Sequence, residues 1–210
     1  SHNPDNVDLK LVTADRNDLD VSNLDLIGPF LQSVAPDFVI NAVGYTAVDR
    51  AESEKALADR VNCEAVAEVA RYCRDTGSPL LHISTDYVFA GNSDTPYSES
   101  DAVGPTGVYG QSKFAGEQAV RESVSRYIIL RTAWVFGAHG NNFVKTMLRL
   151  ASDKSELSIV ADQVGAPTSA RAISAVIASI VFQMLDAEVD DDRWGTYHFS
   201  GQPYVSWADF

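Results

Sequence analysis

Leu80-Leu81-His82-Ile83-Ser84 opens a stretch of sequence that continues through a helical pattern at Tyr109 to Ser125 and ends with Ile128-Ile129-Leu130-Arg131-Thr132. The first and last segments are mainly continuous apolar runs, which is typical of strands covered on both faces. In the middle segment apolar residues recur every three or four positions, as in an amphipathic helix. The order of strand, helix and strand predicts two parallel strands joined by a helix.

The same alternation continues on both sides of this stretch. Further strands are predicted at Leu9 to Ala14, Phe38 to Val43, Leu157 to Val160 and Thr196 to Phe199. Further helices are predicted at Ser22 to Val34, Ala51 to Arg74, Asn142 to Ala151 and Ala170 to Leu185. The repeated order predicts an α/β fold of the Rossmann-like kind, in which helices cover both faces of a doubly wound parallel sheet.

Composition limits the classes of protein that this chain can represent. A chain of 210 residues with 45% hydrophobic residues is long and apolar enough for a sizeable core. The 16 Lys and Arg residues against 29 Asp and Glu residues give a net charge of -13, which disfavours binding to nucleic acid or to anionic membrane surfaces. No apolar run approaches the roughly 20 residues of a membrane-spanning helix, and we expect a cytoplasmic protein.

The two cysteines do not indicate a disulfide or a metal site. Cys63 and Cys73 fall in one predicted helix, where ten residues of helical rise separate them by about 15 Å, too far for a disulfide. Neither has a histidine at the spacing of zinc ligands. We therefore predict no metal site.

Tyr109 and Lys113 form the clearest chemical pattern in the chain. Their spacing of four residues places both on one face of the predicted helix. A tyrosine transfers protons near neutrality only when its phenolate is stabilised, and a nearby ammonium group does this electrostatically. Thr85 follows a predicted strand 24 residues upstream, where its hydroxyl could bind the carbonyl oxygen that Tyr109 protonates. These three residues are the candidate catalytic groups.

Several blocks of sequence occur in an order that resembles a known family. They are Asn41-Ala42-Val43-Gly44-Tyr45-Thr46-Ala47-Val48-Asp49, Ser84-Thr85-Asp86-Tyr87-Val88-Phe89, Tyr109-Gly110-Gln111-Ser112-Lys113, Arg131-Thr132-Ala133-Trp134-Val135-Phe136-Gly137, Asn141-Asn142-Phe143 and Asp162-Gln163-Val164-Gly165-Ala166-Pro167-Thr168. Together they resemble the dTDP-4-dehydrorhamnose reductase family of the extended short-chain dehydrogenase/reductase superfamily. Two blocks, the one with Thr85-Asp86-Tyr87 and the last one, are more discriminating than the Thr, Tyr and Lys set that the whole superfamily shares, because related sugar-nucleotide epimerases and dehydratases carry different sequences there.

The resemblance implies an oxidoreductase in the biosynthesis of dTDP-rhamnose. NADPH or NADH would deliver a hydride to the C4 ketone of dTDP-4-dehydro-6-deoxy-L-mannose, giving dTDP-L-rhamnose. Tyr109 would donate the proton, Lys113 would hold the nicotinamide ribose and lower the pKa of Tyr109, and Thr85 would polarise the carbonyl group. Asn62 matches a superfamily position linked to a proton relay.

The resemblance also implies the residues that contact each ligand. The cofactor-binding residues would be Asp20, Val21, Asn41, Ala42, Val43, Tyr109 and Lys113. The substrate-binding residues would be Thr85, Asp86, Tyr87, Trp134, Asn142, Gln163 and Pro167. Trp134 and Tyr87 are equally compatible with packing in the core. Arg16 is a candidate partner for a 2′-phosphate, without deciding between NADPH and NADH.

The domain division follows from the same resemblance. Residues 1–137 would form the dinucleotide-binding domain, to which the chain returns near 157–185, and residues 138–210 would largely bind the substrate. Asp8 to Ala14 resembles the second strand of the family fold, so we expect the first strand and its Gly-rich turn to precede this chain. Ser206 and Asp209 have the spacing of a capping box and predict a helix that continues beyond Phe210.

Two other functions stay open at this point. The chain could be a non-catalytic, nucleotide-binding regulatory subunit that resembles the beta subunit of methionine adenosyltransferase. It could also reduce another 4-keto-deoxysugar nucleotide, because hexose isomers that differ at one hydroxyl cannot be told apart from these motifs. A homodimer is kept as an expectation that the sequence alone does not test.

Overall fold

A four-stranded parallel sheet organises the chain. The computed structural model describes residues 9–210. Its sheet has the order β1-β2-β3-β7, formed by β1 (Val39–Asn41), β2 (Leu80–Thr85), β3 (Tyr127–Thr132) and β7 (Gly195–His198). Thr85 pairs with Thr132 in the register of β2 and β3, so the strands end together at one edge of the sheet. The parallel sheet predicted from the sequence is confirmed.

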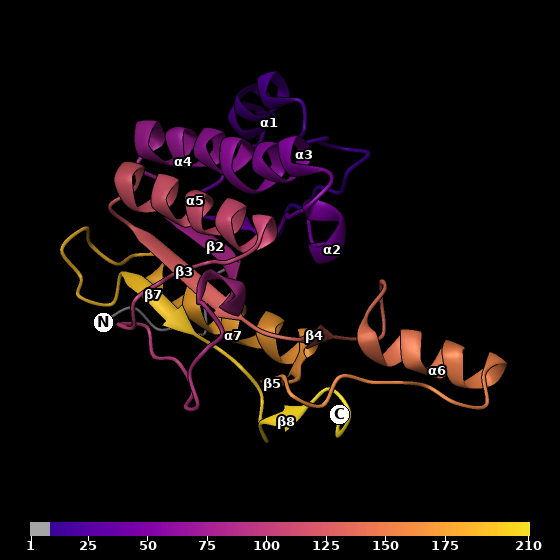
Figure 1. Cartoon of the computed structure of the whole chain (residues 1–210). Coiled ribbons are helices and arrows are strands. Elements are labelled where there is room, and N and C mark those ends of the chain that lie inside the picture. Colours follow the sequence, from indigo (N-terminus) through magenta and orange to yellow (C-terminus); the bar gives the residue numbers. More distant parts are fainter. Residues whose placement is uncertain (1–8) are drawn as a thin grey trace.

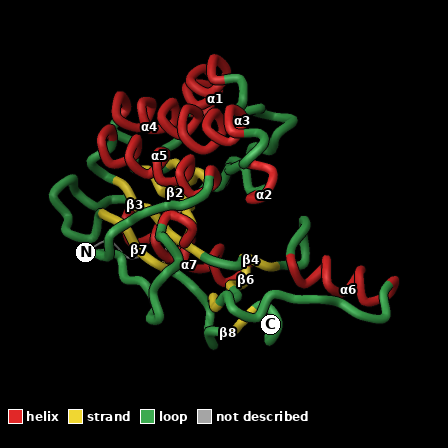
Figure 2. Tube along the Cα trace, in the orientation of Figure 1, coloured by secondary structure: helices red, strands yellow, loops and turns green. Residues whose placement is uncertain are grey.

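Helices lie on both sides of this sheet. Figures 1 and 2 show α1 (Ile27–Val34), α4 (Ala65–Thr76) and α5 (Val108–Ser123) on one side and α7 (Ala170–Met184) on the other. The fold is therefore α/β and Rossmann-like, as predicted. The remaining helices and strands are η2 (Leu24–Leu26), α2 (Val48–Ala51), α3 (Lys55–Asp59), η3 (Arg60–Glu64), η4 (Asp86–Val88), β4 (Val135–Phe136), α6 (Phe143–Asp153), β5 (Val164–Gly165), β6 (Thr168–Ser169) and β8 (Val205–Ser206).

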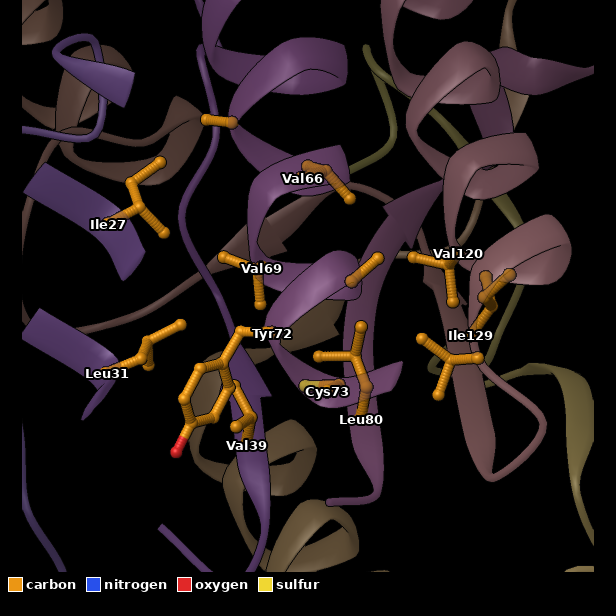
Figure 3. Close-up of a cluster of buried hydrophobic side chains, with 13 residues drawn as sticks. Ile27, Leu31, Val39, Val66, Val69, Tyr72, Cys73, Leu80, Val120 and Ile129 are labelled. Atoms are coloured by element: carbon orange, nitrogen blue, oxygen red, sulfur yellow. The ribbon is translucent and has the colours of Figure 1, made fainter. Parts of the chain in front are cut away.

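The main hydrophobic core lies between the sheet and the layer of α1, α4 and α5. Figure 3 shows side chains from all three helices meeting side chains from the strands. Leu80 and Ile129 of the sheet and Val120 of α5 are fully buried. Each side chain of this size contributes about 1.5–3 kcal/mol when it is removed from water. This packing holds α5 against β2 and β3.

Two predicted strands are wrong. Leu9 to Ala14 and Leu157 to Val160 are both irregular. Leu11 is 77% exposed, and no strand within residues 9–210 pairs with its segment. An apolar run becomes a strand only where a neighbouring strand accepts its backbone hydrogen bonds. The prediction for Asp8 itself lies outside the described residues.

The predicted helix Ala51 to Arg74 is divided in the structure. A turn separates α2 from α3, where Ser53 donates its hydroxyl proton to the carbonyl of Arg50 instead of continuing the helix. The helical run then continues from α3 through the π-helix η3 into α4. The wider π turn carries Asn62 into the interior, where it is fully buried.

The C-terminal part forms a smaller aromatic cluster beside the sheet. Trp134 stacks on Trp207 with ring centroids 3.5 Å apart, and Phe143 and Phe210 pack around this pair. Helix α6 begins at Phe143 and projects away from the sheet in Figure 1, and none of its residues is buried.

The predicted capping contacts at the C-terminal end of the chain are present. Ser206 donates its hydroxyl proton to Asp209 and accepts the backbone N–H of Asp209. No helix among residues 9–210 is both long and apolar enough to cross a membrane.

Candidate active site

The start of helix α5 lies directly on the turn that follows β2. A Cβ atom on Gly110 would overlap with the backbone carbonyl of Tyr87, so only glycine permits this approach. The backbone N–H of Val108, at the first turn of α5, donates to the Glu52 carboxylate at 2.8 Å. These contacts bring Tyr109 to the end of β2, beside Thr85.

Tyr109 is held in its protonated form. Burial raises the pKa of Tyr109 to about 12, although a hydrogen bond with Thr85 lowers it. Its ring meets the ring of Tyr87 edge to face, with centroids 5.4 Å apart. The phenol is therefore protonated at neutral pH and can donate a proton to a developing alkoxide. Lys113 is not among the groups that shift its pKa, so the lowering of the Tyr109 pKa that the resemblance implied is not present in this structure.

The hydroxyl of Thr85 links Tyr109 to the η4 turn. It accepts the backbone N–H of Tyr87 at 3.2 Å and donates to the Asp86 carboxylate at 3.0 Å. Burial raises the pKa of Asp86, and the hydrogen bond from Thr85 opposes that rise. Thr85, Asp86, Tyr87 and Tyr109 are therefore brought together, as the sequence predicted for residues at one strand end.

Lys113 lies one helical turn after Tyr109 and is 5% exposed. Its Nζ donates to the backbone carbonyl of Ile83 at 2.7 Å and lies 3.5 Å from Nε2 of His82. Burial lowers the pKa of Lys113 to about 8, while the charge of Glu117 raises it. The amine is thus mainly charged at neutral pH.

An asparagine on a helix face is usually solvated, but Asn62 is fully buried. Its side-chain oxygen accepts the N–H of Tyr45 at 2.8 Å, and its amide group donates to the Tyr45 carbonyl and to the Ser112 hydroxyl. Gly116 of α5 lies against the Asn62 carbonyl so closely that a Cβ atom would overlap with it. In this structure Asn62 braces η3 against α5.

The residues predicted to bind the cofactor fall into two groups. Ala42 and Val43 follow β1 and are exposed, Val43 by 44%, so these apolar side chains are not part of the core. Asn41 is buried, and its side chain accepts the N–H of Val43. Gly44 is next in the chain, and a Cβ atom placed on it would lie 3.9 Å from Nζ of Lys113. An open strand end beside a charged amine fits a nicotinamide nucleotide.

Asp20 and Val21 form the second group. The Asp20 carboxylate accepts the N–H and the hydroxyl of Ser22 at 3.0 and 2.7 Å, and these bonds lower the pKa of Asp20. Val21 packs against the main core. Arg16 is largely exposed, with its guanidinium 3.9 Å from Asp20.

The other predicted substrate residues lie in the C-terminal part. Trp134 stacks in the aromatic cluster and covers Gly165, while the carbonyl of Pro167 lies against Gly201. Asn142 caps α6 by accepting the N–H of Lys145, and Gln163 is exposed. Among residues 9–210, no hydrogen bond or aromatic contact joins this group to Thr85, Tyr109 or Lys113.

Sequence reasoning missed two charged or titratable groups beside this site. His82 is fully buried next to Lys113, and both burial and the Lys113 charge hold the pKa of His82 well below its ordinary value. Glu117 is fully buried one turn after Lys113. In the sequence, both could have been noticed because each is a titratable residue inside an otherwise apolar pattern, His82 in a strand and Glu117 in a helix.

Comparisons with known proteins show the family of this chain. The chain matches the family described as RmlD substrate binding domain over residues 2–210. It is 43% identical over 206 residues to dTDP-4-dehydrorhamnose reductase of Aggregatibacter actinomycetemcomitans, an alignment that covers 98% of this chain and 69% of the relative. The Escherichia coli K12 enzyme of the same name is 41% identical over 191 residues, covering 91% of this chain and 63% of the relative.

Solved structures give the same result. The crystal structure of dTDP-4-dehydrorhamnose reductase from Bacillus anthracis, in complex with NADP, is similar with a TM-score of 0.84 and 38% identity. That similarity covers 94% of this chain and 68% of the other. Sequence identity above 40% and a shared fold lead to one conclusion: the chain belongs to the dTDP-4-dehydrorhamnose reductase family.

Proposed function

We propose that this chain reduces the C4 ketone of dTDP-4-dehydrorhamnose to give dTDP-L-rhamnose. The observation that carries the proposal is the position of all three groups at the carboxyl end of β2: Thr85 ends the strand, Tyr109 forms a hydrogen bond with Thr85, and Lys113 donates to the carbonyl of Ile83. The relatives named for this reaction, and the neighbour solved with NADP, support the same substrate and a nicotinamide cofactor. Bound NADPH or NADH would supply the hydride.

Each of the three residues has a separate task in this proposal. Tyr109 donates its phenolic proton to the C4 oxygen as negative charge develops there. Thr85 turns its hydroxyl proton from Asp86 to the same oxygen and stabilises that charge. Lys113 binds the nicotinamide ribose with its ammonium group, which also stabilises the phenolate that Tyr109 leaves.

The remaining ligand contacts complete the proposal. Ala42 and Val43 would lie under the cofactor beside Asn41, with Asp20 and Val21 at its adenine end. Asp86 and Tyr87 would contact the sugar near Tyr109. Trp134, Asn142, Gln163 and Pro167 would contribute from the C-terminal part once the nucleotide-sugar is bound.

The domain division, location and assembly belong to the same proposal. Residues 1–137 would hold the cofactor, with the chain returning near 157–185, and residues 138–210 would largely hold the substrate. The proposed location is the cytoplasm, and cell fractionation tests this location. A homodimer is the proposed assembly, and analytical ultracentrifugation tests it.

Consumption of reduced cofactor tests the function. Loss of NADPH or NADH absorbance is measured with dTDP-4-dehydrorhamnose and, in parallel, with isomeric 4-keto-6-deoxysugar nucleotides. We expect the fastest loss with dTDP-4-dehydrorhamnose. A faster rate with an isomer would transfer the proposal to that sugar. Cofactor binding without consumption on any of them would favour a non-catalytic nucleotide-binding subunit.

Replacement of Lys113 tests its contact with the cofactor. Lys113→Met is expected to weaken cofactor binding about 10-fold or more, because a hydrogen bond from a charged group is lost. Fluorescence titration of the reduced cofactor gives the dissociation constant. Lys55→Met is the matched control, since among the described residues Lys55 forms only an exposed ion pair with Asp59. Equal dissociation constants for Lys113→Met and the parent would remove Lys113 from the cofactor site.

A further inference from the structure

Glu117 is the centre of a buried charge cluster behind the candidate active site. It has no exposed surface. Its carboxylate accepts two hydrogen bonds from Arg131, at 2.8 and 2.7 Å, and one from Arg121 at 2.8 Å. Ser84 donates a fourth at 2.6 Å. Such a carboxylate is fully paired, and these partners hold the pKa of Glu117 below its ordinary value despite burial.

The cluster joins the two elements that supply the catalytic groups. Glu117 lies on α5 one turn after Lys113, so both side chains share a helix face. Ser84, which donates to Glu117, directly precedes Thr85 on β2. Arg131 extends the connection to β3 and is itself only 4% exposed. The contacts of Glu117 therefore fix α5 in register against the strand that carries Thr85.

Glu117 also supplies negative charge beside Lys113. His82 is kept neutral by burial and by the Lys113 ammonium, so it does not offer a counter-charge. The charge of Glu117 is the contribution that raises the pKa of Lys113 against the effect of burial. The other titratable or charged groups on the elements packed around this part of α5 include Arg131 on β3, Arg121 and Tyr109 on α5, His198 on β7, Asp86 and Tyr87 on η4, Cys63 on η3, and Asp49 and Glu52 at α2.

We propose that Glu117 is a positioning residue: its hydrogen bonds with Ser84 and Arg131 anchor α5 to β2 and β3, and its carboxylate, one helical turn after Lys113, is the counter-charge of the Lys113 ammonium group. The proposal rests on the proposed function for the role of Lys113 in the reaction. A purely structural role would be different, because Glu117 would then only neutralise the buried guanidinium of Arg131.

Direct titration of Lys113 separates these two roles without any turnover. The chain has five lysines, so the side-chain Cε signals of ¹³C-lysine-labelled protein can be assigned by the loss of one signal in Lys113→Met. The parent signal is expected to titrate near pH 8. In Glu117→Gln the midpoint should fall by about one pH unit, because the counter-charge is lost while the side-chain shape is kept.

Three further variants complete the experiment. Glu117→Gln leaves Arg131 buried without a partner and can unfold the chain, so the double variant Glu117→Gln/Arg131→Met removes both charges. We expect the double variant to fold and its Lys113 midpoint to lie below that of Arg131→Met, which differs from it only in the charge of Glu117. Arg121→Met is the matched control, because it removes a half-exposed partner of Glu117 and keeps the negative charge. Its Lys113 midpoint should not fall.

The outcomes are distinct. A midpoint in the double variant below that of Arg131→Met supports the counter-charge role. An unchanged midpoint in folded Glu117→Gln, or equal midpoints in the double variant and Arg131→Met, would show that Glu117 only neutralises Arg131 and would overturn the proposal. The titration needs no substrate. An inactive parent protein would therefore contradict the proposed function, while the Lys113 midpoints would still test the role of Glu117.

Discussion

Tyr109→Phe is expected to lower turnover about 100-fold or more, which is the typical contribution of a lost general acid. The substitution removes the phenolic oxygen and retains the ring that meets Tyr87 edge to face. Fold and cofactor affinity should therefore be kept. Turnover is measured with saturating reduced cofactor and dTDP-4-dehydrorhamnose, and thermal unfolding checks the fold.

Tyr127→Phe is the matched control for this result. Tyr127 begins β3, packs partly buried against the main core, and makes no side-chain hydrogen bond within the described residues. Removal of its hydroxyl should leave turnover within about 2-fold of the parent, because it contacts none of the reacting groups. Near-normal turnover in Tyr109→Phe would remove Tyr109 from the chemistry.

Gly116→Ala in α5 is expected to lower the stability of the chain strongly. The new Cβ atom would overlap with the carbonyl oxygen of Asn62, which belongs to backbone and cannot rotate away. Helix α5 would have to move from η3, breaking the bond between Asn62 and Ser112. We expect the free energy of unfolding to fall by about 2 kcal/mol or more, even though alanine favours helix.

Urea denaturation measures this loss, with Gly28→Ala as its control. Gly28 lies in α1, and a Cβ atom there would meet nothing within 4 Å. That variant should be about as stable as the parent, because the added methyl group meets no described residue. A Gly116→Ala protein as stable as the Gly28→Ala protein would show that α5 does not rest on η3.

The sequence predicted the sheet best where long apolar runs find partners. The segments at β2, β3 and α5 combine strong patterns with mutual packing, and their bounds are close to the prediction. Leu9 to Ala14 has a similar pattern but no neighbouring strand in the described residues. The predicted helix Ala51 to Arg74 is divided where the Ser53 hydroxyl bonds to the Arg50 carbonyl. The spacing of apolar residues does not predict such a side-chain bond.

The candidate site was predictable to the extent that its residues are close in sequence. Tyr109 and Lys113 share a helix face, and Thr85 ends a strand, so their meeting follows from the order of elements. The role of Glu117 could not be predicted, because its partners Ser84 and Arg131 lie 33 and 14 residues away. The wider turn at Asn62 likewise depends on the contact with Gly116.

Hydride transfer to C4 is the central claim, and transfer of deuterium tests it most directly. The protein is incubated with dTDP-4-dehydrorhamnose and reduced cofactor in which both hydrogens at C4 of the nicotinamide ring are deuterium. We predict dTDP-L-rhamnose with one deuterium at C4 of the sugar, seen by mass spectrometry and proton NMR, and almost none with Tyr109→Phe. A product without deuterium, or label at another carbon of the sugar, would contradict the account.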